Sequence, residues 1–433
     1  MFLENHQICL AADYYALGVR ARDPHRSEAR PPLEEKVIRF RAKVGMASNL
    51  PDWLDLARGL AAVEVLIFHS YQLLFEEQLP GATHDGPIVL VYSVIWALSG
   101  HGVAAVIVFF VLSGYLVGGP ALVRAKNGEL NAIDYFSARA SRLYVVLLPA
   151  LAVSLFFYLL ATQSDKWQPF VAFHQHILAA SGLFSSSVSP AAALCNGLFL
   201  QTIACSTYAG NLALWSLSNE FWYYVLILAL LSVGKRPTWI LAIAAILALF
   251  VVAERADVRG YHTGLKFTFY FLIWCVGALV YAVVLPLRMW LLGLLISLAG
   301  IYLLQAKGLL PGWAAYHLTV SILTAAAILG IEFTRLSLPP SLYFARDIAK
   351  WSFSLYAIHY PILVFLNVSI AAEKREFTIG SLALDMLFIL CGLLAAFIFY
   401  LLFERHTDAV RARLRTVIGK RPSKPRMEKS LAP

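Results

Sequence analysis

Ten apolar stretches, each long enough to cross a lipid bilayer as a helix, run through this 433-residue sequence. A spanning helix needs about 20 residues, and inside lipid its backbone polar groups must bond to one another. Only 14% of the residues are charged, against about 25% in soluble domains, so a water-soluble globule could not cover this much apolar surface. The stretches are 56–75, 102–118, 143–162, 212–233, 237–253, 265–285, 288–306, 313–333, 351–371 and 380–403. The sequence therefore predicts an all-α fold, a polytopic membrane helix bundle of about ten transmembrane helices.

Lys and Arg residues indicate which loops face the cytoplasm, because basic loops are retained on that side. With the N-terminus in the cytoplasm, the cytoplasmic loops and tail beyond the first span hold 19 of these residues, and the outer loops hold six. Both termini are therefore predicted to be cytoplasmic. The net charge of +9 follows from this asymmetry, so the lipid bilayer is a predicted partner and nucleic acid is not.

The two ends of the chain are polar and differ from the membrane domain between them. We predict a polar cytoplasmic leader over 1–50, the membrane domain over 51–410 and a basic cytoplasmic tail over 411–433. Residues 1–45 lack the apolar core of a secretory signal peptide. Two interpretations stay open, a disordered leader or a true translation start at Met46.

The longest predicted outer loop, 163–211, contains Cys195 and Cys205. In an oxidising compartment these two thiols can pair, and the nine residues between them permit closure without requiring it. The alternative is two unpaired small residues. The five cysteines show no metal-ligand spacing, so no metal site is predicted.

Ionisable residues inside a membrane span are costly, and each is therefore a candidate functional residue. Arg58 and His69 are eleven residues apart in the first span. They lie on one helix face, about 20° from perfect alignment and separated by roughly 16 Å along the axis. One face thus joins a basic cytoplasmic entrance to a buried base. The alternative is an arginine that reaches the interface and a hydrogen-bonded core histidine.

Two later spans also carry ionisable residues. Glu220 follows Trp215 in the fourth span, and its depth, roughly 20 Å from the cytoplasmic end, matches that of His69. The two side chains could therefore meet in a shared cavity. His359 lies in the ninth span, three residues after Tyr356, and Pro361 should kink that helix and free a carbonyl. For Glu220 and His359, a structural hydrogen bond to a neighbouring helix is the alternative.

The second span ends in Phe-Phe-Val-Leu-Ser-Gly, with Ser113 followed by a glycine that permits close backbone approach. Arg139 and Arg142 precede the third span at the cytoplasmic face. Paired arginines suit phosphate recognition, because each guanidinium can bind two oxygens at once. The alternative is charge that only sets topology.

Together these motifs resemble the acyltransferase 3 family of membrane proteins, which includes O-antigen, exopolysaccharide and Nod-factor acyltransferases. The resemblance covers residues 52 to 410, in order and at family spacing. The chain departs from the family pattern in four places. Phe353 stands where Tyr is usual, Val145 and His406 stand where Pro is usual, and the acidic residue that often precedes the Phe-Phe motif is absent, since residues 104–108 are all apolar. The matching segments are Arg58 to His69 (R-x10-H), Phe109 to Gly114 (FFVLSG), Arg139 and Arg142 (R-x-x-R), Trp215 to Glu220 (W-S-L-x-x-E), Ser352 to Pro361 (S-Y-S-L-Y-x-x-H-x-P) and Glu404 with Arg405 (E-R-P).

The resemblance implies an acyltransferase domain over 51–410, in a bacterial inner membrane. It would move an acyl group, acetyl by default, from cytoplasmic acyl-CoA to a hydroxyl of an extracytoplasmic or lipid-linked carbohydrate. Acyl-CoA is thus a co-substrate, and no permanently bound cofactor is expected. The expected catalytic residues are His69, as general base, and Glu220, as its orienting partner. The expected substrate-binding residues are Arg58, Arg139, Arg142, Ser113, Trp215, Tyr356 and His359.

Two alternatives stay open at this point. His69 could itself carry the acyl group as a covalent intermediate. A different class of function, a proton-coupled transporter or flippase of a sugar-containing substrate, would use the intramembrane His and Glu as proton relays. Transporters of that kind usually show repeated segments in their two halves, and this sequence shows none.

The topology can be tested with reporter fusions. We expect a fusion at the C-terminal tail and a fusion in the 163–211 loop to report opposite sides of the membrane. A phosphatase reporter that is active only outside the cytoplasm should therefore be silent at the tail and active in the loop. Phosphatase activity at the tail would contradict the predicted orientation.

Overall fold

The computed structural model describes residues 50–75, 93–97, 99–174, 188–201, 203–232, 263–283, 285–334, 336–371 and 373–419. Within these ranges the chain is all-α, with two isolated β-bridges, Phe75 to Arg375 and Gln201 to Cys205, and no strand. The leader, Met46, the predicted span 237–253 and the end of the tail lie outside the described residues. The fold class predicted from the sequence is thereby confirmed.

The described helices follow the predicted spans in order. The first half holds α3 (Leu50–Leu74), α5 (Gly102–Ser113), η2 (Gly114–Gly118), α6 (Gly119–Lys126), α7 (Ala132–Thr162), α8 (Trp167–Phe173), α10 (Pro190–Gly197), η4 (Tyr208–Gly210) and α11 (Leu214–Ser232). The second half holds α13 (Thr263–Ala282), α14 (Leu287–Ala306), α15 (Gly312–Thr334), η5 (Pro340–Leu342), α16 (Tyr343–Asp347), η6 (Ile348–Trp351), α17 (Ser352–Leu366), η7 (Asn367–Ala371), α18 (Ile379–Leu402), η8 (Glu404–His406) and α19 (Thr407–Gly419).

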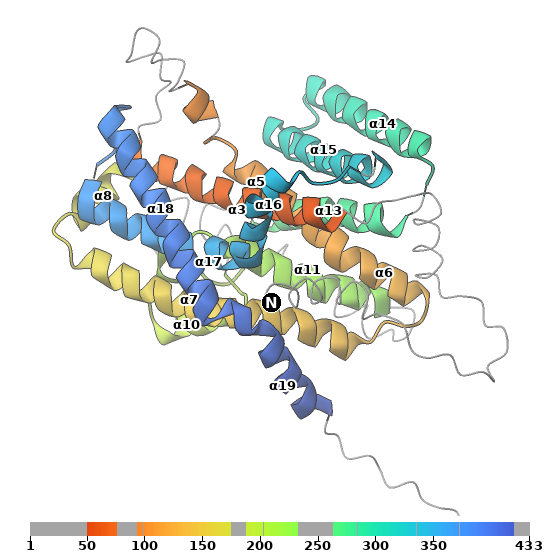
Figure 1. Ribbon diagram of the computed structural model, residues 1–433, viewed down its shortest axis with the longest axis horizontal. Helices are drawn as coiled ribbons and strands as arrows, with labels where there is room; N and C mark the ends of the chain where they lie inside the picture. Colours follow the sequence, from red (N-terminus) through yellow and green to blue (C-terminus); the bar gives the residue numbers. More distant parts are fainter. Residues whose placement is uncertain are drawn as a thin grey trace, which may run out of the picture.

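Seven helices among the described residues are long and apolar enough to cross a membrane. The helix α3 is not one of the seven, because Arg58, Glu64 and His69 lower its hydropathy. Its polar residues are instead shielded by neighbouring helices, since α3 packs against α5, α16, α17 and α18. Figure 1 shows α3 and α17 among the central helices, while α14 and α15 lie together at one edge and α19 extends away from the bundle.

The start of α7 differs from the prediction. The helix begins at Ala132, eleven residues before the predicted limit of 143, so Arg139 and Arg142 lie on α7 and not ahead of it. The Asn131 side chain accepts hydrogen bonds from the backbone N–H groups of Ile133 and Asp134 and so satisfies two free donors at the helix start. Hydropathy alone missed this polar first part of the helix.

Glycine permits a very close crossing of the second and sixth predicted spans, as expected for Gly114. A Cβ atom at Gly114 would lie 1.8 Å from the Trp274 carbonyl oxygen, and one at Gly277 would lie 1.9 Å from the Val111 carbonyl oxygen. Helix backbones can meet this closely only where side chains are absent. Directly after Ser113 the helix continues as the π-helical segment η2, a geometry often found at functional sites.

Pro361 interrupts the hydrogen bonding of α17, as the sequence predicts. Proline has no backbone N–H, so the Ala357 carbonyl four residues earlier loses its helical donor. The Asn211 side chain replaces that donor, because its Nδ2 lies 2.8 Å from the Ala357 oxygen. The same Nδ2 lies 2.9 Å from the Ser154 hydroxyl on α7, so Asn211 joins α7 to α17 inside the bundle.

The segment before Asn211, part of the predicted outer loop, contains a disulfide. Of the two alternatives for its cysteines, paired or unpaired, the structure shows the pair. Cys195 and Cys205 are bonded, with Cα atoms 6.4 Å apart. Asn196 braces the same loop, because its Nδ2 donates to the Ser206 carbonyl and its Oδ1 accepts from the Tyr208 N–H. This braced loop leads directly into η4 and Asn211.

We expect Asn211→Ala to lower the free energy of unfolding by about 1–3 kcal/mol, because a buried carbonyl would lose its only substitute donor. The measurement is a denaturant titration of purified protein in detergent micelles. Ser154→Ala is the matched control, since it removes a partner of Asn211 and leaves the Ala357 carbonyl satisfied. Equal losses in the two variants would contradict the role given to Pro361 and Asn211.

Candidate functional site

Two buried histidines meet at the centre of the bundle. Nδ1 of His69 on α3 lies 3.0 Å from Nε2 of His359 on α17. The His69 side chain is 9% exposed and His359 is fully buried. This pairing could not be predicted from the sequence, because the two residues are 290 positions apart.

The contacts of the pair define which nitrogen carries each proton. Nδ1 of His359 lies 3.0 Å from the Leu355 carbonyl oxygen, which can only accept, so this Nδ1 carries hydrogen. Nε2 of His359 is then an acceptor and receives the Nδ1–H of His69. The His69 ring also has a hydrogen bond with the Val65 backbone. With Nδ1 as the donor to His359, the lone pair of a neutral His69 is on Nε2. The arrangement leaves one basic nitrogen in the pair.

Glu220 lies in a separate polar group and has no contact with His69 among the described interactions. Its Oε1 accepts hydrogen bonds from the Ser113 hydroxyl, at 2.9 Å, and from the Tyr224 hydroxyl. The indole Nε1 of Trp274 donates to the Ser113 hydroxyl oxygen at 3.1 Å. Among the described residues the structure therefore brings His359, and not Glu220, next to His69, while Glu220 joins the end of α5 to α11.

Tyr356 lies between the histidine pair and the Glu220 group. Its hydroxyl shares a hydrogen bond with the Ser216 hydroxyl, with the two oxygens 2.6 Å apart. Its ring centroid lies 6.0 Å from that of His359, and its hydroxyl interacts electrostatically with Glu220. Trp215 is placed differently, because its ring packs against Phe110 and Tyr270 in an aromatic cluster.

The three arginines singled out in the sequence come together at the predicted cytoplasmic side. Arg58 and Arg142 interact electrostatically, as do Arg139 and Arg142. Within the described residues neither Arg139 nor Arg142 has an acidic partner within ion-pair distance, and Arg142 is exposed. The Nε of Arg139 is buried without a hydrogen-bond partner. Arg139 and Arg142 thus have positive charge without an ion-pair partner among the described residues, and Arg139 has an unused donor, which suits an anionic ligand.

Arg58 is fixed in place by the segment that covers the predicted cytoplasmic end of α3. Its Nη2 donates to the Ala349 carbonyl of η6 at 2.8 Å, and its Nη1 lies 3.5 Å from Asp55. The cover is close because a Cβ at Gly59 would lie 2.7 Å from the Ala345 carbonyl oxygen of α16. The guanidinium is therefore held at the mouth of the polar face that continues to His69.

Glu404 belongs to this region, although the sequence analysis gave it no role. Its Oε2 accepts hydrogen bonds from the Ser354 N–H at 2.9 Å and from the Ser354 hydroxyl at 2.6 Å. It also interacts electrostatically with Arg142 and Arg58. The Glu404-Arg405 motif could have identified it. In the structure the Glu404 carboxylate lies between the start of α17 and the arginines.

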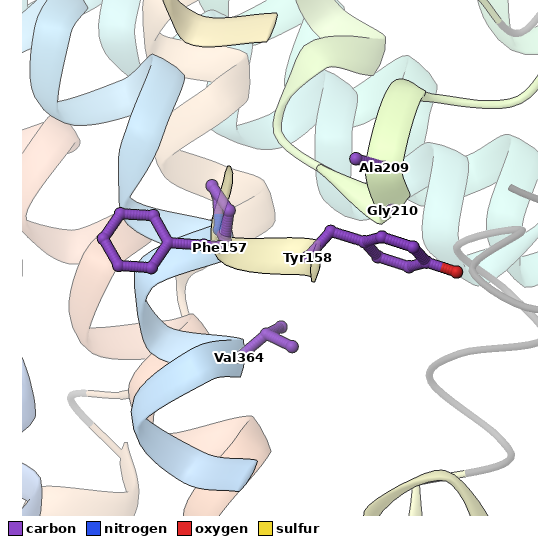
Figure 2. A pocket seen from close by; sticks show the side chains of 6 residues that line it. Phe157, Tyr158, Ala209, Gly210 and Val364 are labelled. Carbon is purple, nitrogen blue, oxygen red and sulfur yellow. The ribbon is translucent and has the colours of Figure 1, made fainter. Parts of the chain in front are cut away.

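A small hollow opens between α7, η4 and α17, beside Pro361. Figure 2 shows Phe157 and Tyr158 pointing in opposite directions from α7, with Ala209 and Gly210 on the neighbouring segment. No ionisable acid or base that could serve as a general base lines it. The hollow is therefore separate from the histidine pair and from the arginine cluster. In the described part of the chain, no group of three or more His, Cys, Asp or Glu side chains could hold a metal ion.

Comparison with known proteins assigns the family. Residues 52–405, most of the chain, match the family described as an acyltransferase domain, acyltransferase 3. The comparison with curated proteins and the comparison with solved structures gave no match. The matched segment contains the histidine pair, the Glu220 group and the arginine cluster, and it ends just after Glu404. The chain therefore belongs to the acyltransferase 3 family, and it is a multi-pass membrane enzyme that transfers acyl groups other than amino-acyl groups.

Proposed function

We propose that this enzyme moves an acyl group, acetyl by default, from cytoplasmic acyl-CoA to a hydroxyl of a carbohydrate at or beyond the outer face of a bacterial inner membrane. The basic Nε2 of His69 is the observation that carries the proposal. It is a base with a defined tautomer, and it lies on one helix face with an arginine at the cytoplasmic mouth. Acyl-CoA is the donor whose charge fits that mouth.

The arginine cluster supports an acyl-CoA donor. The phosphates of CoA are polyanionic, and Arg139 and Arg142 offer guanidinium groups with no acidic partner within ion-pair distance among the described residues, beside Arg58, which pairs with Asp55. Arg58 and His69 are separated by roughly 16 Å along α3. The extended pantetheine arm can follow this face, so that phosphates bound at the arginines leave the thioester near His69.

The chemical step needs only the histidine pair and the two substrates. Nε2 of His69 takes the proton from the acceptor hydroxyl while the hydroxyl oxygen attacks the thioester carbonyl carbon. The carbon–sulfur bond breaks, and the CoA thiolate leaves and takes the proton back from Nε2. His359 keeps His69 in the required tautomer by accepting its Nδ1–H, which is the orienting role that a carboxylate has in other catalytic triads.

His69 is close to the outer end of α3, which supports an acceptor that arrives from outside. The helix ends at Leu74, five residues after His69, which corresponds to about 8 Å. The donor and the acceptor can therefore approach the same nitrogen from opposite sides of the membrane.

The base can be tested in purified, reconstituted protein supplied with labelled acetyl-CoA and membrane glycolipid. General-base assistance is typically worth about 10²–10⁴ in rate, so His69→Ala should abolish detectable transfer while the protein inserts normally. His359→Gln and His359→Leu form a matched pair. Gln can still accept a hydrogen bond from His69 and should retain more of the rate than Leu, which cannot.

Wild-type transfer by His69→Ala would eliminate this mechanism. Equal rates for His359→Gln and His359→Leu would show that the tautomer is held by something other than the acceptor on α17. The assay follows the label into carbohydrate, so a transporter, which would move its substrate without acylating it, gives no signal.

The donor site can be tested with Arg142→Ala. Loss of one phosphate-binding guanidinium should raise the KM for acyl-CoA by roughly 10-fold or more, because hydrogen bonds between charged groups contribute about 1.5–3 kcal/mol. The KM for the acceptor should stay unchanged. Lys166→Ala is a suitable control, since Lys166 lies in the predicted outer loop and, among the described residues, donates to the Ser369 carbonyl. A change in the acceptor KM alone would reverse the assignment.

A further inference from the structure

Asp385 is a buried carboxylic acid that the proposed mechanism does not use. It is the only charged residue of α18, and its side chain is 4% exposed. An ionisable group within a membrane helix is costly and is usually retained for a function. The motifs of the sequence do not include it.

Asp385 contacts the residue that follows the proposed base. The Ser70 hydroxyl donates to Oδ1 of Asp385 at 2.5 Å, and Ser70 is fully buried. Oδ2 of the same carboxylate accepts no hydrogen bond from the described residues, and it is not completely buried. One oxygen is therefore anchored to α3, while the other keeps its capacity to accept hydrogen bonds.

A second polar group lies beside this carboxylate. Tyr71 follows Ser70, and its hydroxyl interacts electrostatically with Asp385. That hydroxyl is buried without a hydrogen-bond partner. Its ring is fixed by contacts with Phe75 and Phe377, whose centroids lie 5.1 and 5.5 Å away. A rigidly held hydroxyl and a rigidly held carboxylate oxygen thus occur together, and neither has its hydrogen-bonding capacity filled.

The two groups lie on the side of His69 from which an acceptor would come. Ser70 is four residues before the end of α3 and Asp385 is six residues after the start of α18, which correspond to about 6 and 9 Å. The outer end of α3 is tied to the α17–α18 connection, because the Arg375 N–H donates to the Leu74 carbonyl at 2.8 Å. The groups therefore lie between His69 and the predicted outer face.

We propose that Oδ2 of Asp385 and the Tyr71 hydroxyl form an acceptor subsite that binds hydroxyl groups of the carbohydrate on the outer side of His69. The inference rests on the proposed function. A carboxylate accepts strongly from sugar hydroxyls, and a phenol can both donate and accept. The peptide link from His69 to Ser70, and the hydrogen bond from Ser70 to Asp385, keep this subsite at a fixed position relative to the base.

The test compares KM values for the two substrates in the reconstituted enzyme, with labelled acetyl-CoA and glycolipid extracted from host membranes and titrated by sugar content. Asp385→Asn keeps an oxygen for Ser70 but loses the charge, and it should raise the acceptor KM by about 10- to 100-fold. Tyr71→Phe keeps the ring contacts and should raise the acceptor KM about 2- to 10-fold. The KM for acetyl-CoA should be unchanged in both variants.

Glu64→Gln is the matched control. Glu64 is a carboxylate on α3, the helix that carries Tyr71. It accepts a hydrogen bond from the His101 N–H at 3.1 Å, which the amide oxygen of Gln can retain. Its acceptor KM should equal that of the unaltered protein. Unchanged acceptor KM values in both Asp385→Asn and Tyr71→Phe would overturn the subsite, as would equal increases for donor and acceptor. An unaltered protein that transfers no label would instead overturn the proposed function itself.

Discussion

The hydrogen bond between His69 and His359 is the interaction on which the site depends. It joins α3 to α17, and neither helix could move against the other without breaking it. Further polar contacts fix α17: Asn211 bonds to the Ala357 carbonyl, and Glu404 bonds to Ser354 at the start of the helix. Because lipid offers no competing hydrogen bonds, these contacts determine how the helices are aligned as much as apolar packing does.

Charge is separated along α3 in a way that suits a reaction between two compartments. The predicted cytoplasmic end gathers several guanidinium groups, which repel one another and interact with Asp55 and Glu404. Toward the predicted outer end lies the carboxylate of Asp385, bonded to Ser70. Between them lies the pair of imidazoles of His69 and His359, a side chain that can be buried in its neutral form and can accept a proton. The helix thus presents different chemistry to substrates from each side.

The sequence predicted the helices better than their contacts. Hydropathy located the spans, and ionisable residues within them identified most of the candidate site, because a charge in lipid is rare enough to be informative. The predicted span 143–162 missed the first part of α7, because that part is polar and is stabilised by the Asn131 cap and not by lipid. The contact between His69 and His359 was not predicted. Depth along a helix does not determine how the helix is rotated, so the depth match between His69 and Glu220 could not show that His359 faces His69. Asp385 was overlooked because it stands alone and belongs to no motif.

The disulfide of the predicted outer loop bears on how the site is held together. The Cys195–Cys205 bond and the Asn196 contacts define the loop that delivers Asn211 to α17, the helix that carries His359. Disulfides form and persist mainly in oxidising compartments. Because Asn211 follows this loop directly, the covalent state of the loop bears on the position of the helix that carries His359.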